Sequence, residues 1–300
     1  MSFLPFENTS EQHQAFVHLH KAAWPHLPLL SEAETRHSHE ELSKNARFYQ
    51  RWWLLEKNKK VGHVLFFSPW WWQATHSLMF KLMVYPEKKQ LGFGTRLLKK
   101  LCDEATVQKY TSIGVDVFDL YPHHIRFAEK YGFVAKQSDI CSLFKATQDI
   151  PEAFQNIYKK VVASGIEIIS GKTFLCRYHG DWQERWWRAE INTLKDVPSP
   201  FPRKNMTFEQ WVARLKIPNF NPHDFVFAIH DNDIVGISGG VIFPAEPTLA
   251  GVRFTGVLNT YRRKGIAKAL KYAATRHLLD TGVKQIVTNN EVNNPMLEIN

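Results

Sequence analysis

Two stretches of the chain combine the hydrophobic pattern of a β-strand with that of an amphipathic helix. In each stretch apolar residues first alternate with other residues and then, after a polar turn, recur at intervals of four. The alternating positions are Leu78, Phe80, Leu82 and Val84 in the first stretch and, more loosely, Val252, Phe254 and Val257 in the second. The helical positions are Leu97, Leu101 and Ala105, and then Leu270, Ala274 and Leu278. Each half of the chain is therefore predicted to contain a strand followed by a helix that packs on a sheet.

Further strands are predicted on both sides of each strand and helix. Upstream, residues 53–64 and 226–236 place apolar runs around a polar turn, which is the pattern of an antiparallel hairpin. Downstream, residues 113–117 and 285–288 are short apolar runs that follow each helix. A strand, a helix and a second strand in this order predict two parallel central strands joined by a right-handed crossover.

The turn between strand and helix has the same pattern in both halves. It reads Lys89 to Gly94 in the first half and Arg262 to Ala267 in the second, and the glycines Gly92 and Gly265 are 173 residues apart. The same spacing relates the strands before the turns and the helices after them. Such a turn suits a pyrophosphate, because small residues let backbone N–H groups approach the anion and the helix N-terminus adds partial positive charge. The GxxxxGK[ST] loop is absent from the sequence, and GxGxxG fails because leucine replaces its third glycine.

The length of 300 residues and this in-register repeat predict two domains of similar size. We place the N-terminal domain at residues 1–148 and the C-terminal domain at residues 166–300. A linker helix is expected between them at residues 149–165, because an Asp-Ile-Pro-Glu sequence is typical of a helix start.

Two features of the second half have no counterpart in a simple repeat. Residues 181–194 and the stretch around 208–212 are helix-rich, and we expect them to form an acceptor-binding lip. The segment Gly132-Phe133 has no equivalent before Asn300, the last residue. The second domain is therefore expected to lack its last strands, either because the chain is truncated or because a strand is supplied from elsewhere.

Composition narrows the class of protein. Hydrophobic and aromatic contents of 44% and 13% favour folded cores over disorder. Apolar runs such as residues 64–67 are far shorter than the ~20 residues of a membrane span, and the N-terminus shows no signal-peptide pattern. The 3 cysteines lie far apart without a CxxC pair, which suits a reducing cytoplasm and gives no metal framework. The net charge of +9 is spread along the chain without a nucleic-acid-binding signature, so a phosphate-rich ligand accounts for it at least as well.

At the two turns the chain resembles the GNAT superfamily of N-acetyltransferases, in a tandem two-domain form. The resemblance rests on Val84 with Lys89 to Thr95, on Thr255 to Val257 with Tyr261 to Lys268, and on the closing segment Tyr131 to Phe133. It implies an α/β (α+β) fold with two acyl-CoA N-acyltransferase domains, each a mixed, mostly antiparallel sheet flanked by helices. In this family the turn binds the pyrophosphate of acetyl-CoA, and the end of the preceding strand hydrogen-bonds the pantetheine arm.

The resemblance implies two sets of residues that contact acetyl-CoA. In the first half they are Val84, Lys89, Gln90, Gly92, Phe93, Gly94 and Thr95. In the second half they are Thr255, Val257, Leu258, Arg262, Arg263, Lys264, Gly265, Ile266, Ala267 and Asn289. The second turn matches the family pattern more specifically, because the first begins with Lys where Arg or Gln is usual. We therefore expect the second domain to hold the better cofactor site.

The resemblance also implies direct attack of an amine on the thioester, which needs a neutral amine and so a general base or a water chain. A backbone N–H near Val257 is expected to polarise the carbonyl. The tyrosine that the family often places four residues before the closing Gly is Ala128 in the first half, and neither strand that leads to a turn carries an acidic residue. Glu291, just after the second parallel strand, is our candidate for the base.

The main hypothesis is an acetyl-CoA-dependent N-acetyltransferase that acts on a primary amine of a small molecule or peptide, with the C-terminal domain active. Two alternatives stay open. Aminoacyl transfer from charged tRNA would suit the basic charge, although such proteins need not keep the turn that this chain has twice. A non-catalytic CoA-binding or regulatory protein would suit the missing tyrosine and carboxylate. No motif in the sequence identifies the acceptor or the oligomeric state.

Overall fold

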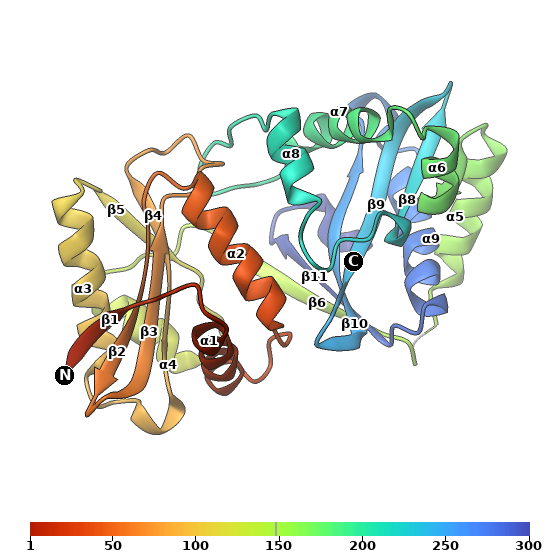
Figure 1. Ribbon diagram of the computed structural model, residues 1–300. Coiled ribbons are helices and arrows are strands. Elements are labelled where there is room, and N and C mark those ends of the chain that lie inside the picture. Colours follow the sequence, from red (N-terminus) through yellow and green to blue (C-terminus); the bar gives the residue numbers. More distant parts are fainter. Residues whose placement is uncertain (148) are drawn as a thin grey trace. The chain divides into compact units, whose positions relative to one another are not determined.

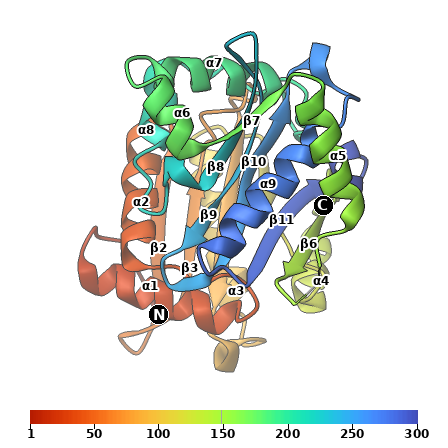
Figure 2. The same cartoon turned by 90° about the vertical axis from the view of Figure 1, so that its right-hand side faces the viewer.

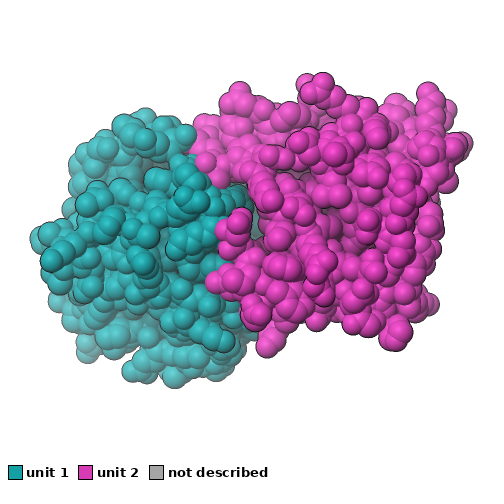
Figure 3. Space-filling model, turned by 90° about the horizontal axis from the view of Figure 1, so that it is seen from above, with its two compact units in different colours: residues 1–136, 200–204 teal, residues 137–199, 205–300 magenta. Residues whose placement is uncertain are grey.

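The computed structural model describes residues 1–147 and 149–300 (Figure 1). They form two compact units, one of residues 1–136 and 200–204 and the other of residues 137–199 and 205–300 (Figure 3). Each unit contains one mixed sheet with helices on both faces, which confirms the predicted fold class. In this described part of the chain, none of the helices has the length and apolar character needed to cross a bilayer.

The first unit is built on a five-stranded sheet with the order β1-β2-β3-β4-β5. The strands are β1 (Ser2–Pro5), β2 (Tyr49–Glu56), β3 (Lys59–Phe67), β4 (Ser77–Val84) and β5 (Ser112–Val115). The first four are antiparallel neighbours, whereas β4 and β5 are parallel. The β2–β3 hairpin turns at Lys57 and Asn58, whose positive φ angles of 47° and 61° are those of a tight turn. The predicted hairpin and the parallel pairing are confirmed, but β5 lies at the edge of this sheet and not at its centre.

Helices cover both faces of this sheet (Figure 1). Helices α3 (Phe93–Val107) and α4 (Pro122–Lys130) lie on one face, and α1 (Ser10–Ala23) and α2 (Glu32–Asn45) lie on the other. The predicted apolar stripe of α3 is buried on the sheet against residues such as Val64, Phe66 and Leu78. Phe16 and Leu19 of α1 pack on Trp53 and Met83 on the opposite face. Strand β4 thus contributes to two separate cores, with Leu78 and Phe80 on one face and Met83 on the other.

The second unit is built on a six-stranded sheet with the order β6-β11-β10-β9-β8-β7. The strands are β6 (Asp139–Lys145), β7 (Glu167–Ser170), β8 (Phe225–His230), β9 (Asp233–Phe243), β10 (Glu246–Val257) and β11 (Gln285–Glu291). All neighbours are antiparallel except β10 and β11, which are parallel. The β8–β9 hairpin turns at Asp231 and Asn232, as the sequence predicts.

Strand β6 lies in the second sheet, although the sequence places its residues in the N-terminal domain. Its partners on β11 run from Gln285 opposite Lys145 to Glu291 opposite Asp139. This pairing satisfies backbone groups on the outer edge of β11, which local hydrophobic pattern alone cannot assign. The compact units accordingly divide after residue 136, whereas the N-terminal domain expected from the sequence ends at residue 148. The strand beside β11 thus comes from earlier in the chain.

The helices of the second unit also form two groups (Figure 2). Helices α5 (Glu152–Ala163) and α9 (Ile266–Asp280) cover one face, and α6 (Gly171–Arg177), α7 (Trp182–Leu194) and α8 (Phe208–Arg214) cover the other. The fully buried Trp186 and Trp211 lie on α7 and α8, in the core with Phe225 and Phe227 of β8. Helix α5, expected as a linker, instead packs through Val161 into the core beneath α9.

Candidate functional site

The two turns have nearly the same backbone conformation. Gln90 and Arg263 have φ angles of 62° and 60°, and Gly92 and Gly265 have φ angles of 80° and 82°. The residues that begin the two turns also agree, with ψ angles of 157° and 162° and the same φ of −67°. Glycine is required at the second left-handed position because other residues adopt it only with strain. The repeated sequence pattern therefore specifies a repeated backbone.

Each glycine places the free N-terminus of a helix at the turn. Gly92 precedes α3 and Gly265 precedes α9, and within the described residues neither helix has a side-chain cap. The first N–H groups of a helix have no partner inside the helix, and with the helix dipole they form an anion site. The turn residues selected from the sequence, including Phe93, Gly94, Ile266 and Ala267, lie at these two helix starts.

In both units the two parallel strands diverge before they reach the turn. The β4–β5 pairs end at Phe80 opposite Val115, while β4 continues to Val84. The β10–β11 pairs end at Gly251 opposite Val287, while β10 continues to Val257. Among the described residues the last part of each strand therefore has no parallel partner. An extended ligand chain placed there would lead from the edge of the strand to the helix N-terminus.

The first turn is in contact with α4. The Nζ atom of Lys89 lies 3.1 Å from Nε2 of His123, and the Thr95 hydroxyl lies 2.6 Å from that of Tyr131. The ring of Phe127 lies against Gly94, 3.3 Å from the position that a Cβ would take. Burial lowers the pKa of Lys89. The first turn is therefore partly covered by aromatic side chains.

The second turn is in contact with α5 and with an acidic residue. The Nε atom of Arg262 donates to the Val257 carbonyl at 3.1 Å, and its Nη2 forms a 2.6 Å ion pair with Asp196. A Cβ at Gly265 would lie 2.9 Å from Ile157 of α5. Arg263 and Lys264 are exposed at the turn, and Leu258 donates its N–H to Val235 at 2.9 Å. Two basic side chains are thus available at the surface, whereas Arg262 is already engaged.

The other residues selected from the sequence lie on β10 and β11. Thr255 shares a 2.8 Å hydroxyl contact with Ser238, and Asn289 lies opposite Cys141 of β6. Both carboxylate oxygens of Glu291 accept hydrogen bonds from Asn293, one from its backbone N–H and one from its side-chain amide, each at 2.9 Å. Glu291 lies at the far end of β11 from the β10 pairs. Its role as a base stays a prediction, and its carboxylate would first have to leave Asn293.

The structure adds a charged group that the sequence did not suggest. Glu190 of α7 is buried and accepts a 2.9 Å hydrogen bond from the Trp211 indole, and Arg214 lies 3.8 Å from its other oxygen. The guanidinium of Arg253 lies 5.4 Å from the centre of the Phe220 ring. Burial and, to a smaller extent, the charge of Arg214 lower the pKa of Arg253 to about 10, although Glu190 opposes the change. No local sequence signal joins these residues, because they come from different elements.

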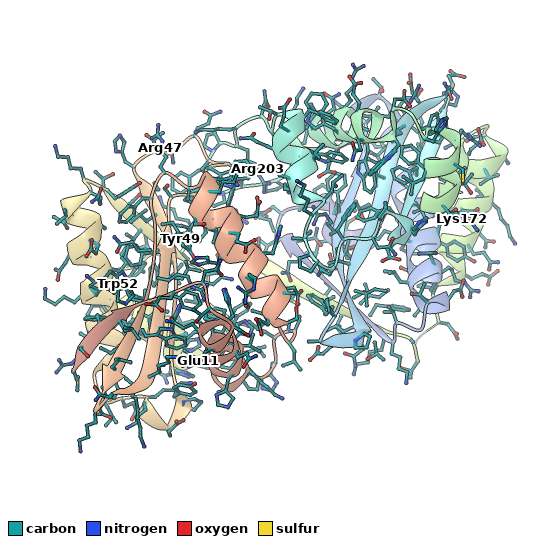
Figure 4. All side chains as sticks on the ribbon, in the orientation of Figure 1. Glu11, Arg47, Tyr49, Trp52, Lys172 and Arg203 are labelled. Carbon is teal, nitrogen blue, oxygen red and sulfur yellow. The ribbon has the colours of Figure 1, made fainter. Side chains whose placement is uncertain are left out.

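The first unit has a different polar cluster on the matching face of its sheet. Tyr49 of β2 reaches His39 of α2, with 2.6 Å between the hydroxyl and Nδ1 (Figure 4). Arg51 donates from Nε to His63 at 3.3 Å and stacks on Phe6, with 3.6 Å to the ring centre. Burial raises the pKa of Tyr49 to about 12 and lowers that of His63 well below its usual value. Arg51 and His63 are buried and packed by rings, and Tyr49 and His39 are partly buried, which favours a structural role for this cluster.

Comparison with known proteins supports the fold. The model of the acetyltransferase (GNAT) family matches residues 13–133 and 181–298, and each region contains one of the two turns. A GCN5-related N-acetyltransferase from Sphaerobacter thermophilus is similar in structure, with a TM-score of 0.68 and 16% identity over 98% of this chain and 90% of that chain. A tandem GNAT protein from the clavulanic acid biosynthesis pathway has a TM-score of 0.72 and 14% identity over 99% and 92% of the two chains. A search of curated proteins finds no match.

Proposed function

Because the chain belongs to the acetyltransferase (GNAT) family, we propose that it transfers an acetyl group from acetyl-CoA to a primary amine of a small molecule or peptide. We further propose that the C-terminal domain holds acetyl-CoA. The observation that carries this proposal is the turn from Arg262 to Ala267, where left-handed Gly265 precedes the uncapped N-terminus of α9. The turn directly follows the part of β10 that has diverged from β11.

The residues of this turn fit the phosphate end of acetyl-CoA. The backbone N–H groups at the start of α9 would bind the pyrophosphate, and the exposed cations Arg263 and Lys264 would add charge attraction. The diverged edge of β10, between Val252 and Val257, would hydrogen-bond the pantetheine arm. This arrangement would bring the thioester toward the place where β10 and β11 separate.

Acetyl transfer would then occur between the diverging strands. Bound acetyl-CoA supplies the thioester, whose C–S bond breaks as the acceptor nitrogen forms the new C–N bond, and the proton lost by the amine neutralises the departing thiolate. The backbone N–H groups of β10 near Val257 are our candidates for polarising the carbonyl. Glu291 is our candidate base.

The surroundings of the two turns support the choice of the C-terminal domain. In the first unit the Phe127 ring occupies space beside Gly94, and Tyr131 holds Thr95. A ligand at the first turn would have to displace these contacts. In the second unit α5 approaches Gly265 from the side of Ile157, and Arg263 and Lys264 stay exposed.

A matched pair of substitutions tests which turn binds acetyl-CoA. Ala267→Glu adds a negative charge at the second turn, and Gly94→Glu adds one at the corresponding position of the first. We expect Ala267→Glu to weaken acetyl-CoA binding at least ~100-fold, about 2.7 kcal/mol, and Gly94→Glu to change it by less than about threefold. Acidic residues are favourable in the first turn of a helix, so the charge itself should not unfold α9. Isothermal titration calorimetry of both variants measures the effect.

Ala267→Gln is the control for size without charge, and it should bind acetyl-CoA much better than Ala267→Glu. The assignment to the C-terminal domain is wrong if Gly94→Glu abolishes binding while Ala267→Glu does not. If wild-type protein binds acetyl-CoA but acetylates no amine in a broad panel, the chain is a non-catalytic CoA-binding protein. That outcome would agree with the absence of an acidic residue on β10 after Glu246, the first residue of the strand.

A further inference from the structure

Arg253 lies at an irregular point of β10. The antiparallel pairing with β9 shifts between Val252, opposite Gly240, and Phe254, opposite Gly239, so Arg253 is the extra residue of a β-bulge. The last parallel pair with β11 is at Gly251. The bulge therefore lies where β10 and β11 begin to diverge, which is where the proposed reaction would take place. Bulges re-aim side chains and are over-represented beside active sites.

The side chain of Arg253 lies on the face of the sheet covered by α7 and α8. Its guanidinium is near the Phe220 ring and interacts electrostatically with Arg214 and Glu190. Glu190 is held by the Trp211 indole and lies 3.8 Å from Arg214. Its charge acts on Arg253 from a greater distance, against that of Arg214. Within the described part of the chain, no hydrogen bond or ion pair of Arg253 is present.

A half-buried arginine that lacks a hydrogen bond or ion pair is costly unless an anion supplies one. On the premise of the proposed acetyl transfer, we propose that Arg253 binds an acidic group of the acceptor, a carboxylate or a phosphate. The planar guanidinium can donate two parallel hydrogen bonds to either group. The acceptor would then be a small molecule that carries both a primary amine and an acidic group.

Glu190 and Arg214 have positioning roles in this proposal. Glu190, fixed by Trp211, would orient the arginines, and Arg214 would contribute charge without occupying the bulge. The first unit differs at the corresponding strand position, where the spacing of 173 residues places Phe80. The neighbouring cation Lys81, opposite Leu65, interacts electrostatically with Asp116, which follows β5, and the β4 pairing has no register shift. A half-buried cation at a bulge is therefore a property of the second unit.

The test compares acidic amines with matched neutral amines. Amino acids are paired with their carboxamides, and aminoalkyl phosphates with the corresponding amino alcohols. Acetylation is followed by CoA thiol release, and binding by the thermal shift of the protein in the presence of CoA. In one of the two series we expect kcat/KM to be at least tenfold higher for the acidic amine than for its matched neutral amine. Arg253→Met should lower this preference at least tenfold by raising the KM for the acidic amine. Arg253→Lys should retain part of the preference.

Arg177→Met is the matched control, because Arg177 lies on α6, outside the expected acceptor-binding lip, and pairs with Glu167 at the surface. It should leave the preference unchanged. The inference is wrong if neutral amines bind and react as well as acidic ones, if the preference survives in Arg253→Met, or if no acidic amine binds. If acidic amines bind through Arg253 but none is acetylated, the acid site stands and the proposed acetyl transfer fails. The carboxylate and phosphate pairs show which anion the site takes.

Discussion

The turns after β4 and β10 share a backbone conformation but differ in what surrounds them. The φ angles of Gly92 and Gly265 are 80° and 82°, whereas no atom lies within 4 Å of a Cβ built at Gly92, and Ile157 lies 2.9 Å from one at Gly265. The first turn is bounded by α4 and the second by α5. A repeated local sequence therefore fixes the anion-binding backbone, while non-local packing decides how a ligand reaches it.

The largest expected difference is in the effect of a Cβ at the two glycines. Gly92→Ala should cost about 1 kcal/mol of stability, since only the left-handed conformation is strained. Gly265→Ala should cost about 3 kcal/mol, because the same strain is added to overpacking against Ile157. Hydrogen exchange of the amides in α3 and α9 under native conditions measures the local stability of each helix.

Ile157→Ala supplies the control for this comparison. In that background the additional cost of Gly265→Ala should fall by about 1 kcal/mol or more, because the methyl group then has space. An equal cost of Gly265→Ala in both backgrounds would show that α5 does not restrict the second turn.

The two units should respond to pH with opposite sign. Burial lowers the pKa of His13 and His20, in the first unit, to about 4 from the usual 6.5. Their contribution to stability is complete above pH 6.5 and is lost as the pH falls toward 4, because the unfolded chain binds the protons first. In the second unit the carboxylate of Asp224, 3.5 Å from Nε2 of His277, raises the pKa of His277. Its contribution is present below pH 6.5 and is lost as the pH rises through the folded-state value.

Between pH 7.5 and pH 5 the first unit should therefore lose about 2 kcal/mol of stability from each of His13 and His20, or about 4 kcal/mol together as an upper bound, which solvent screening lowers. Hydrogen exchange of β2 and β3 should show this loss, whereas the amides of α9 should not become less protected. Replacement of both histidines by Gln should flatten the response of the first unit. A parallel loss of protection in both units would refute the difference.

The two turns, the hairpins, the parallel pairs and the helical stripes follow from the sequence because they depend on local periodicity and on conformations that glycine adopts easily. The position of β6 does not, because a strand with modest alternation can pair with any open edge, and the edge of β11 exists only in the folded unit. The packing of α5 beside Gly265 is non-local for the same reason.

The candidate site is predicted unevenly for similar physical reasons. The backbone of the phosphate turn can be read from the sequence, whereas the cluster of Glu190, Arg214 and Arg253 joins two helices and a strand. The sequence contains one sign of this cluster. The apolar alternation of β10 is looser after Val252 than that of β4, and the structure explains this as the bulge at Arg253.

The smallest expected effect concerns the ion pair that engages Arg262. Asp196→Asn removes the partner of its guanidinium, so the cation becomes free to approach a phosphate. Both side chains are partly exposed, at 37% and 53%, so stability should change by less than about 1 kcal/mol. The affinity for acetyl-CoA should rise about two- to fivefold and become more sensitive to salt, since one more cation contributes to the attraction.

Asp103→Asn, which breaks the exposed Lys99 pair on α3, is the matched control and should leave the affinity unchanged. Equal affinities for wild type and Asp196→Asn would mean that Arg262 acts through the Val257 carbonyl, where it holds the end of β10, and makes no contact with the phosphates.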